Sequence, residues 1–381
     1  MPSFRGDMKK VIHIVGARPN FMKVAPIHRA ISARGSLQQL VIHTGQHYDA
    51  KMSDVFFADL GLPPPEIHLG IGSGSHAEQT AKMMVEMEKV FLKEKPDLVS
   101  VVGDVNSTIA AALVTSKLAI PLSHVEAGLR SFERHQPEEI NRVVTDRLSD
   151  LLLTPSRDAD ANLLKEGIDP KYIHLVGNVM IDSLLSSKEK ADQLPTLKTL
   201  GLTPKGYVVA TLHRPSNVDN PKLLAGLLGV LMDVAKELPV VFPVHPRTRK
   251  MISEQGLGPK LEQTPGLKLV DPMGYLEFLS VTSQAKLVMT DSGGLQEETT
   301  ALNVPCLTMR EQTERPITVE VGSNEVVGTD PARIREAANR VLAGDFKKGR
   351  VPELWDGRTG ERIADLYARF LGVAETKRAF G

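Results

Sequence analysis

The sequence has little cysteine, no excess charge of either sign and no long hydrophobic run. Cys306 is the single cysteine among 381 residues, so a disulfide within the chain is excluded. Its strand-like neighbours, VPCLTM, favour a buried thiol over a nucleophile. The 46 basic and 46 acidic residues balance, which excludes bulk attraction of nucleic acid or of an anionic membrane. An anionic ligand must therefore be held by local groups.

Signals for export, membranes and cofactors are also missing. The apolar run VIHIV near the start is too short for a signal peptide, and no stretch is long enough to span a membrane, so we expect a cytoplasmic protein. The 11 histidines are scattered and join no acidic metal triad. Gly70, Gly72 and Gly74 miss the spacing of a dinucleotide fingerprint. We therefore expect neither a metal nor a nicotinamide cofactor.

Short apolar runs alternate with helical stretches along the whole chain. The runs are continuous, as in parallel strands that are buried on both faces. They lie at 10–15, 39–44, 97–103, 121–126, 150–154 and 173–177, and again at 206–212, 239–244, 267–271, 286–290 and 304–309. The sequence therefore predicts an α/β fold of two doubly wound, Rossmann-like domains, residues 1–176 and 206–358, joined by a linker at 177–205. We expect residues 359–381 to form a C-terminal helix that packs back on the first domain.

Two turns between a strand and a helix have the features of anion sites. The segment KLVMTDSGGLQEE has a strand, a turn containing Ser292 and Gly293, and then a helix. A helix N-terminus presents unpaired N–H groups, and glycine lets a phosphate approach them, although an ordinary turn is the alternative. Near the start, Arg18 and Lys23 bracket a helix that Pro19 can begin. The pair of turns favours a phosphate-binding protein.

Polar side chains follow several predicted strands directly. Asp104, Glu126, His213 and His245 all lie at such positions, where doubly wound sheets bind their ligands. The structural alternatives are that Asp104 caps the next helix and that Glu126 pairs with a nearby arginine.

A carboxylate pair opens a further predicted helix. Helical spacing of the apolar residues after Pro137 places Glu138 and Glu139 in its first turn. Stabilisation of the helix dipole is one explanation for the pair. The other is that one of them projects into a cleft between the domains.

These residues lie in motifs that together resemble the non-hydrolysing UDP-N-acetylglucosamine 2-epimerases. The motifs are GARPNFMKVAPI, TGQHYD, GDVNST, HVEAGLRSF, PEEINR, LHRPSNVD, DSGGLQEE and MREQTERP, in order over nearly the whole chain. The resemblance implies a glycosyltransferase-B-like architecture with an interdomain cleft that holds a UDP-sugar. It also implies a homodimer, a role in cell-envelope polysaccharide synthesis and no cofactor.

The resemblance also implies a role for each matching residue. Ser292, Gly293, Arg18 and His213 would bind the diphosphate, and Lys23 would join them. Glu298 would hold the ribose, with Phe278 and His245 near the uracil. The catalytic residues would be Asp104, Glu126, Glu138 and His213.

The implied reaction starts with departure of UDP, because the C2 proton of an N-acetyl sugar is not acidic in the resting substrate. Positive character at C1 then lets a carboxylate remove that proton, which gives 2-acetamidoglucal, and re-addition from the other face gives the epimer. Alternatives are a 2-epimerase of UDP-diacetamido-uronic acid or UDP-glucose, a hydrolysing epimerase, a glycosyltransferase and a UDP-sugar sensor. Activation by substrate at a second site near Gln46 and His47 is not expected, because GIGSGSHAEQT lacks the basic residue of activated members.

Overall fold

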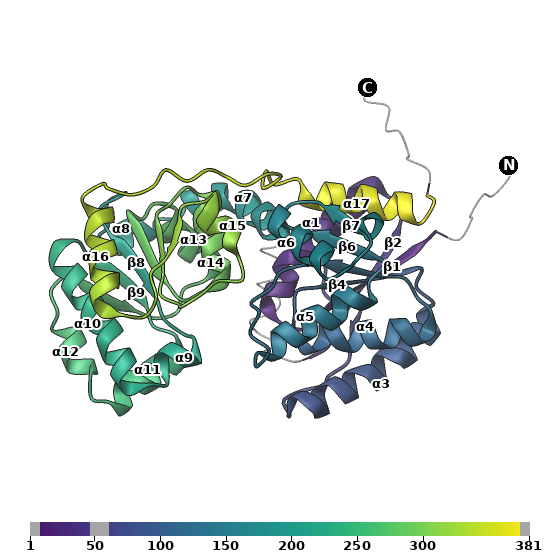
Figure 1. Cartoon of the computed structure of the whole chain (residues 1–381), viewed down its shortest axis with the longest axis horizontal. Coiled ribbons are helices and arrows are strands. Elements are labelled where there is room, and N and C mark those ends of the chain that lie inside the picture. Colours follow the sequence, from purple (N-terminus) through teal and green to yellow (C-terminus); the bar gives the residue numbers. More distant parts are fainter. Residues whose placement is uncertain (1–7, 46–60, 374–381) are drawn as a thin grey trace, which may run out of the picture. The chain divides into compact units, whose positions relative to one another are not determined.

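The computed structural model describes residues 8–45 and 61–373, except for the side chain of Arg18. The chain forms two compact units, which we describe separately. Unit 1 comprises residues up to Ser183 and those from Glu353 onward, and unit 2 runs from Leu184 to Pro352. The first division falls inside helix α7, Val179–Asp192 (Figure 1).

Unit 1 is built on a parallel sheet with the strand order β3-β2-β1-β4-β5-β6-β7. Its strands are short and mostly buried, and a parallel sheet of this kind needs helices on both faces. They are β1 (Lys10–Val15), β2 (Gln38–His43), β3 (Ile67–His68), β4 (Leu98–Val102), β5 (Leu122–Val125), β6 (Leu151–Thr154) and β7 (Ile173–Leu175).

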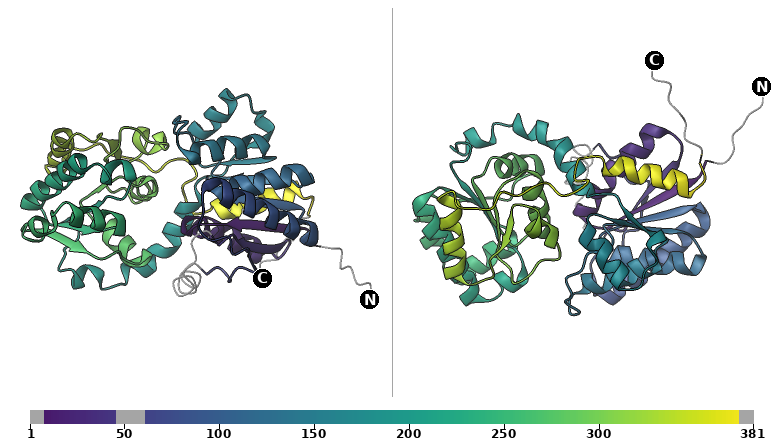
Figure 2. Two further views of the ribbon diagram at one scale, coloured as in Figure 1. Left: turned by 90° about the horizontal axis from the view of Figure 1, so that it is seen from below. Right: turned by 45° about the horizontal axis from the view of Figure 1, so that its top comes forward.

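Helices cover both faces of this sheet. On one face Met83, Met87 and Phe91 of α3 pack with α4 against apolar side chains of the strands. On the other face α1 and α17 lie side by side (Figure 2). The hydroxyl of Tyr367 in α17 hydrogen-bonds to Ser100 Oγ at 2.8 Å, which ties α17 to β4. The helices are α1 (Arg18–Arg34), α3 (His76–Glu94), α4 (Asn106–Leu118), α5 (Pro137–Leu148), α6 (Arg157–Lys165), a 3₁₀ turn at Pro170–Tyr172 and α17 (Thr359–Phe370).

Unit 2 has a second parallel sheet, with the order β10-β9-β8-β11-β12-β13. Its strands are β8 (Val208–Thr211), β9 (Val240–Pro243), β10 (Leu267–Val270), β11 (Leu287–Thr290), β12 (Cys306–Thr308) and β13 (Asn324–Val326). Its helices are α8 (Thr196–Thr199), α9 (Pro215–Val218), α10 (Pro221–Glu237), α11 (Pro246–Glu254), α12 (Gly258–Glu262), α13 (Tyr275–Ser283), α14 (Gly293–Ala301), α15 (Pro316–Glu320) and α16 (Pro331–Leu342).

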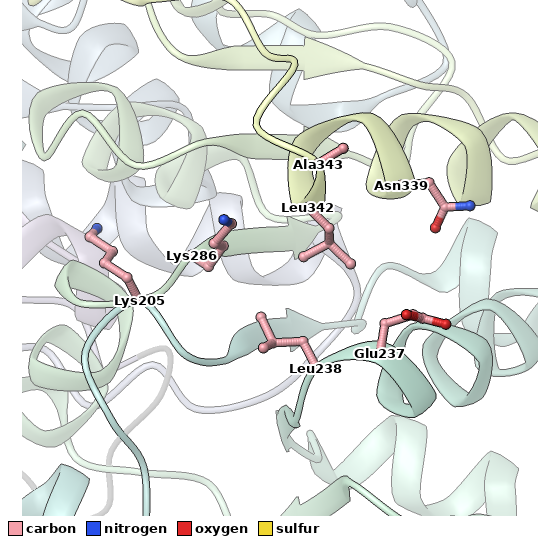
Figure 3. Close-up of a pocket in the computed structure, with 7 residues that line it drawn as sticks. All are labelled: Lys205, Glu237, Leu238, Lys286, Asn339, Leu342 and Ala343. Atoms are coloured by element: carbon pink, nitrogen blue, oxygen red, sulfur yellow. The ribbon is translucent and has the colours of Figure 1, made fainter.

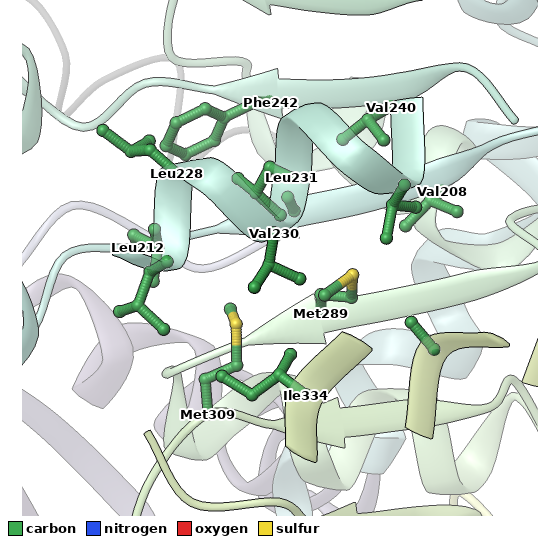
Figure 4. Packing of buried hydrophobic residues seen from close by; sticks show 14 of the residues in the cluster. Val208, Leu212, Leu228, Val230, Leu231, Val240, Phe242, Met289, Met309 and Ile334 are labelled. Atoms are coloured by element: carbon green, nitrogen blue, oxygen red, sulfur yellow. The ribbon is translucent and has the colours of Figure 1, made fainter. Parts of the chain in front are cut away.

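The larger core of unit 2 lies between this sheet and helices α10 and α16 (Figure 4). Leu228 and Leu231 of α10 and Ile334 of α16 pack on Phe242 and Met289 of the strands. Each such side chain contributes about 1.5–3 kcal/mol when it is fully buried. Tyr207, directly before β8, and the alternate strand residues, such as Val209, face a second cluster with α13. Burial on both faces explains why the strands read as continuous apolar runs.

The predicted α/β fold with two doubly wound, Rossmann-like halves is confirmed. Each sheet has the Rossmann order, in which successive strands are added first on one side of the first strand and then on the other. The switch points therefore lie between β1 and β4 and between β8 and β11. The sequence missed β3 and β13, which have 2 and 3 residues. Among the helices of the described residues, none is long and apolar enough to cross a membrane.

Candidate active site

The turn after β1 is fastened to the end of β4 by one side chain. Asn20 Oδ1 accepts hydrogen bonds from the backbone N–H groups of Gly16 and Ala17 at 3.1 and 2.8 Å. Its Nδ2 donates to the carbonyl of Val102 at 3.0 Å. The start of α1 is therefore fixed at the switch point of unit 1. Arg18 begins this helix, but its side chain is outside the described part of the structure, so its role stays a prediction.

Lys23 and Glu126 form a nearly buried ion pair at the same edge. Their side chains are 11% and 7% exposed. Glu126 follows β5 with φ of +71°, a left-handed conformation that is uncommon for a residue other than glycine. A Cβ added at Gly103 would lie 3.4 Å from Lys23 Nζ and 3.9 Å from Glu126 Oε2, so β4, β5 and α1 converge here. The structure thus places Lys23 beside a carboxylate, a contact that the sequence did not indicate.

Asp104 follows β4 and pairs with Arg142 of α5. Arg142 Nη1 also contacts Glu139 Oε2 at 2.5 Å. Glu139 is buried and accepts the backbone N–H groups of Ser131 and Phe132, both at 2.9 Å. Burial tends to raise the pKa of Glu139, but the Ser131 N–H and the Arg142 guanidinium outweigh it and lower that pKa. Arg142, the last residue of the PEEINR motif, therefore links Asp104 to a structural acid.

Glu138 differs from its neighbour because it is exposed in the first turn of α5. The sequence could not decide which of the two acids is available to a ligand. The structure makes Glu138 the accessible member and Glu139 the anchored one. We refer to Lys23, Asp104, Glu126, Glu138 and Arg142 as the carboxylate edge.

A buried hydrogen-bond network lies behind the carboxylate edge and connects to the residue before Asp104. His124 Nε2 donates to the carbonyl of Gly103 at 2.8 Å, and its Nδ1 lies 2.6 Å from Asp146 Oδ1. Arg130 Nη1 lies 2.7 Å from Asp146 Oδ2. Burial tends to raise the pKa of Asp146, but His124 and Arg130 outweigh it and lower that pKa. The network joins Gly103, the residue before Asp104, to α5, and it was not predicted from the sequence.

At the switch point of unit 2, Asp291 orients His213. Asp291 is fully buried, and its Oδ2 accepts the backbone N–H groups of His213 and Arg214, both at 2.9 Å. Its Oδ1 lies 2.9 Å from His213 Nδ1. Burial tends to raise the pKa of Asp291, but the hydrogen bonds from His213 and Arg214 outweigh burial and lower that pKa. Asp291 stands in the DSGG turn, but this role was not predicted from the sequence.

Ser292 and Gly293 form the start of α14, where the sequence predicted a phosphate cradle. Ser292 is the N-cap, and its side chain makes no capping hydrogen bond. Its backbone N–H donates to Thr290 Oγ1 at 2.9 Å. A Cβ at Gly293 would lie 2.8 Å from Arg315 Nη1, so basic groups already crowd this helix end. Such a helix end suits an anion because its N–H groups and dipole point at the ligand.

Three arginines gather beside Gly293 around one carboxylate, Glu314. Arg310 Nη2 lies 2.8 Å from Glu314 Oε2, and Arg315 Nη1 lies 2.5 Å from Oε1. Arg214 Nη2 lies 3.5 Å from Oε1. This cluster was not predicted from the sequence, although two of its arginines lie in the MREQTERP motif. We refer to His213, Arg214, Gly293, Arg310 and Arg315 as the cationic edge.

The predicted nucleotide residues of unit 2 lie on several elements. Glu298 of α14 is buried, and burial, followed by the charge of Glu297, raises its pKa to about 8. Phe278 of α13 is partly buried and packs against the second core cluster. His245 is exposed at the start of α11, with its ring centre 5.8 Å from that of His213. The structure therefore brings His245 close to His213, and the nucleotide roles stay predictions.

Other features lie away from these edges. Figure 3 shows a pocket at the amino ends of β8, β9 and β11, opposite the cationic edge, lined by Lys205, Glu237, Leu238, Lys286, Asn339, Leu342 and Ala343.

Cys306 is buried, as the sequence predicted, and burial raises the pKa of its thiol to about 11. Within residues 8–45 and 61–373, no cluster of three His, Cys, Asp or Glu side chains could hold a metal ion. Gln46 and His47 fall outside these described residues.

Comparison with known proteins identifies the family. The family model of UDP-N-acetylglucosamine 2-epimerase matches residues 29–368. A UDP-N-acetylglucosamine 2-epimerase of Methanococcus maripaludis is 44% identical over 94% of this chain and 98% of its own length. The UDP-2,3-diacetamido-2,3-dideoxy-D-glucuronate 2-epimerase of Pseudomonas aeruginosa is 42% identical over 94% of this chain and 99% of its own.

A solved structure agrees with this match. The UDP-GlcNAc 2-epimerase of Methanocaldococcus jannaschii, in complex with UDP-GlcNAc and UDP, superposes with a TM-score of 0.85 and 43% identity, over 94% of this chain and 99% of that one. The match therefore covers both units and their strand-end residues. The chain belongs to the UDP-N-acetylglucosamine 2-epimerase family.

Proposed function

We propose that this protein interconverts UDP-N-acetylglucosamine and UDP-N-acetylmannosamine by loss and re-addition of UDP. The observation that carries the proposal is the opposite chemistry of the two switch points. The carboxylate edge of unit 1 offers bases and acids, and the cationic edge of unit 2 offers anion-binding groups. An elimination needs both kinds of group, because it produces a proton and a departing diphosphate.

On this proposal, unit 2 binds the nucleotide. Ser292 and Gly293, with His213 and Arg18, hold the diphosphate, since helix N–H groups and cations stabilise the charge that grows as the C1–O bond breaks. The carboxyl oxygens of Glu298 accept hydrogen bonds from the ribose hydroxyls. Phe278 and His245 contact the uracil.

Unit 1 handles the protons. As UDP leaves, electron demand at C1 acidifies the C2 proton, and one of Asp104, Glu126 and Glu138 removes it to give 2-acetamidoglucal. An acid on the other face then delivers a proton to C2 while UDP adds back to C1, which gives the epimer. General acid–base catalysis of this kind contributes roughly 10²–10⁴-fold. We further propose that the protein is a cytoplasmic homodimer that supplies sugar for cell-envelope polysaccharide.

A second candidate is the corresponding epimerisation of a UDP-2,3-diacetamido-uronic acid. It is favoured by the 42% identity to the Pseudomonas aeruginosa enzyme, which nearly equals the identity to the archaeal relatives. Both candidates use the same elimination. They differ at C3 and C6 of the sugar.

A proton NMR time course in D₂O tests the proposal. With UDP-N-acetylglucosamine we expect a UDP-N-acetylmannosamine signal that carries deuterium at C2, together with slow release of 2-acetamidoglucal and UDP. Product that keeps its original C2 hydrogen would contradict elimination. Free N-acetylmannosamine as the main product would indicate a hydrolysing epimerase. A parallel run with the diacetamido-uronic substrate decides between the two sugars by comparing kcat/KM.

A further inference from the structure

An acidic side chain occupies the surroundings that a diphosphate requires. Glu314 is 7% exposed, and Arg310 and Arg315 contact its two oxygens at 2.8 and 2.5 Å. A Cβ built at Gly293 would lie 2.9 Å from Glu314 Oε1, so the carboxylate reaches the N-terminus of α14. Arginines and a helix N-terminus are the groups that proteins use to hold phosphate.

We infer that Glu314 is an internal counter-anion, which competes with the substrate's diphosphate for these groups and is displaced when UDP or a UDP-sugar binds. This inference rests on the proposed function, which puts the diphosphate at Ser292 and Gly293. Two anions within a few ångströms repel each other, and the repulsion is strong where water is excluded. The carboxylate and the diphosphate therefore cannot share the arginines in their present positions.

The charge state of Glu314 supports competition. Burial by itself raises the pKa of Glu314, but the guanidiniums of Arg315 and Arg310 outweigh it and hold that pKa well below its usual range. The side chain is consequently ionised near neutral pH. A bound diphosphate must take over the cations that Glu314 now neutralises.

The arginines have other contacts that remain when Glu314 moves. Arg315 Nε lies 2.9 Å from Glu297 Oε1, and Arg214 Nε donates to the carbonyl of Asp291 at 3.1 Å. Arg310 Nη1 is buried and has no hydrogen-bond partner among the described residues. A phosphate oxygen could therefore satisfy a donor that Glu314 leaves unused, while Glu297 and Asp291 keep the cluster in place.

Calorimetric titration with UDP, inorganic pyrophosphate and uridine tests the inference. Glu314→Gln keeps the shape of the side chain and removes its charge, so we expect it to bind UDP and pyrophosphate at least about tenfold more tightly. Uridine, which has no phosphate, should bind as it does to the wild type. The matched control is Glu320→Gln, an exposed acid on the neighbouring helix α15, which should change none of the three affinities.

The outcomes separate the inference from the proposed function. Wild-type protein that binds no UDP would overturn the proposed function and this inference with it. If the wild type binds UDP and Glu314→Gln binds it equally or more weakly, the inference alone is overturned. Removing a residue with a purely structural role would not tighten phosphate binding, so only a gain in affinity supports a counter-anion. An equal gain for uridine would also overturn it.

A second measurement needs no variant. In a crystal structure of the wild-type protein with UDP, we expect phosphate oxygens to replace Glu314 at Arg310 or Arg315. Both of the present Glu314 contacts persisting beside bound UDP would overturn the inference.

Discussion

The two units share a strand order but carry opposite chemistry at the same edge of the sheet. In unit 1 the groups proposed to act on the sugar are carboxylates, and cations hold two of them: Lys23 pairs with Glu126, and Arg142 pairs with Asp104. In unit 2 the groups proposed to act on the diphosphate are hydrogen-bond donors with arginines beside them, and carboxylates hold two of these groups: Asp291 contacts His213, and Glu314 contacts Arg310. The shared fold thus determines the edge of the sheet at which the candidate residues lie. The residues after each strand determine whether that edge is mainly acidic or mainly basic.

This difference follows from the reaction. An elimination transfers a proton to a base and leaves negative charge on the departing diphosphate. A site rich in carboxylates would repel the diphosphate, and a site rich in cations would not favour a base. Placing the two sets on different units keeps each set next to partners of opposite charge.

The largest expected effect comes from removing a base on unit 1. Glu126→Gln should lower kcat at least about a hundredfold, the range for loss of general acid or base catalysis. UDP affinity should change little, because the proposed diphosphate contacts, Arg18 apart, lie on unit 2. Steady-state kinetics and calorimetry measure the two quantities. Glu88→Gln, an exposed acid of α3, is the control, and lost UDP binding in Glu126→Gln would contradict the division of labour.

Most of the fold could be predicted because parallel strands buried on both faces leave a strong local signal. The run predicted at 10–15 matches β1 residue for residue, and the runs predicted at 97–103 and 286–290 match β4 and β11 to within one residue at each end. β13, Asn324–Val326, was missed because its 3 residues include a polar and a charged side chain. The order of the strands depends on pairing between distant residues, so the sequence predicted doubly wound domains without the order that the structure shows.

The sequence predicted which of the candidate site residues follow strands, but not which partners they contact. A residue directly after a strand is readable from sequence, so Asp104, Glu126 and His213 could be named. Lys23 and Glu126 are 103 positions apart, and no local pattern reports such a contact. The phase of α5 was equally open, since both Glu138 and Glu139 lie in its first turn.

The second prediction compares these two acids. Glu139→Gln should lower the free energy of unfolding of unit 1 by about 1–3 kcal/mol, because it weakens charge-assisted bonds to Ser131, Phe132 and Arg142 in a buried place. Glu138→Gln should leave stability unchanged and lower kcat. Urea unfolding and kinetics of both variants check this. The opposite pattern, with Glu138 the stabilising residue, would show that α5 is rotated from the described phase.

A smaller effect is expected at the helix end of unit 2. Gly293→Ala should weaken UDP binding about tenfold, roughly 1.4 kcal/mol, because the methyl group would cover the N-terminal amide and press on Arg315 and Glu314. Only the tips of flexible side chains are pressed, so stability should change little. The matched control is Gly229→Ala in α10, where no atom lies within 4 Å of the added Cβ. Unchanged calorimetric affinity in Gly293→Ala would remove the cradle from α14.

The smallest expected effect for a single step, one pH unit, is an opposite pH dependence of stability in the two units. Burial, followed by the charge of His28, lowers the pKa of His13 in unit 1 to about 3, from 6.5 in an unfolded chain. As the pH falls below 6.5, the unfolded chain takes up a proton that folded unit 1 refuses, so its stability falls. Burial and Glu297 raise the pKa of Glu298 in unit 2 to about 8, from 4.5. Between pH 4.5 and 8 the folded unit keeps a proton that the unfolded chain has lost, so its stability falls as the pH rises.

Each group should contribute a slope of about 1 kcal/mol per pH unit within its window. Hydrogen exchange in urea, followed by mass spectrometry at β1 for unit 1 and at α14 for unit 2, measures the two slopes separately. His13→Gln should flatten the slope of unit 1 between pH 6 and 5 and leave unit 2 unaffected, since the substituted amide does not titrate. Glu298→Gln should flatten the slope of unit 2 between pH 6 and 7.5 and leave unit 1 unaffected. Slopes of the same sign at β1 and α14 that neither variant alters would show that buried titratable groups do not distinguish the two sheets.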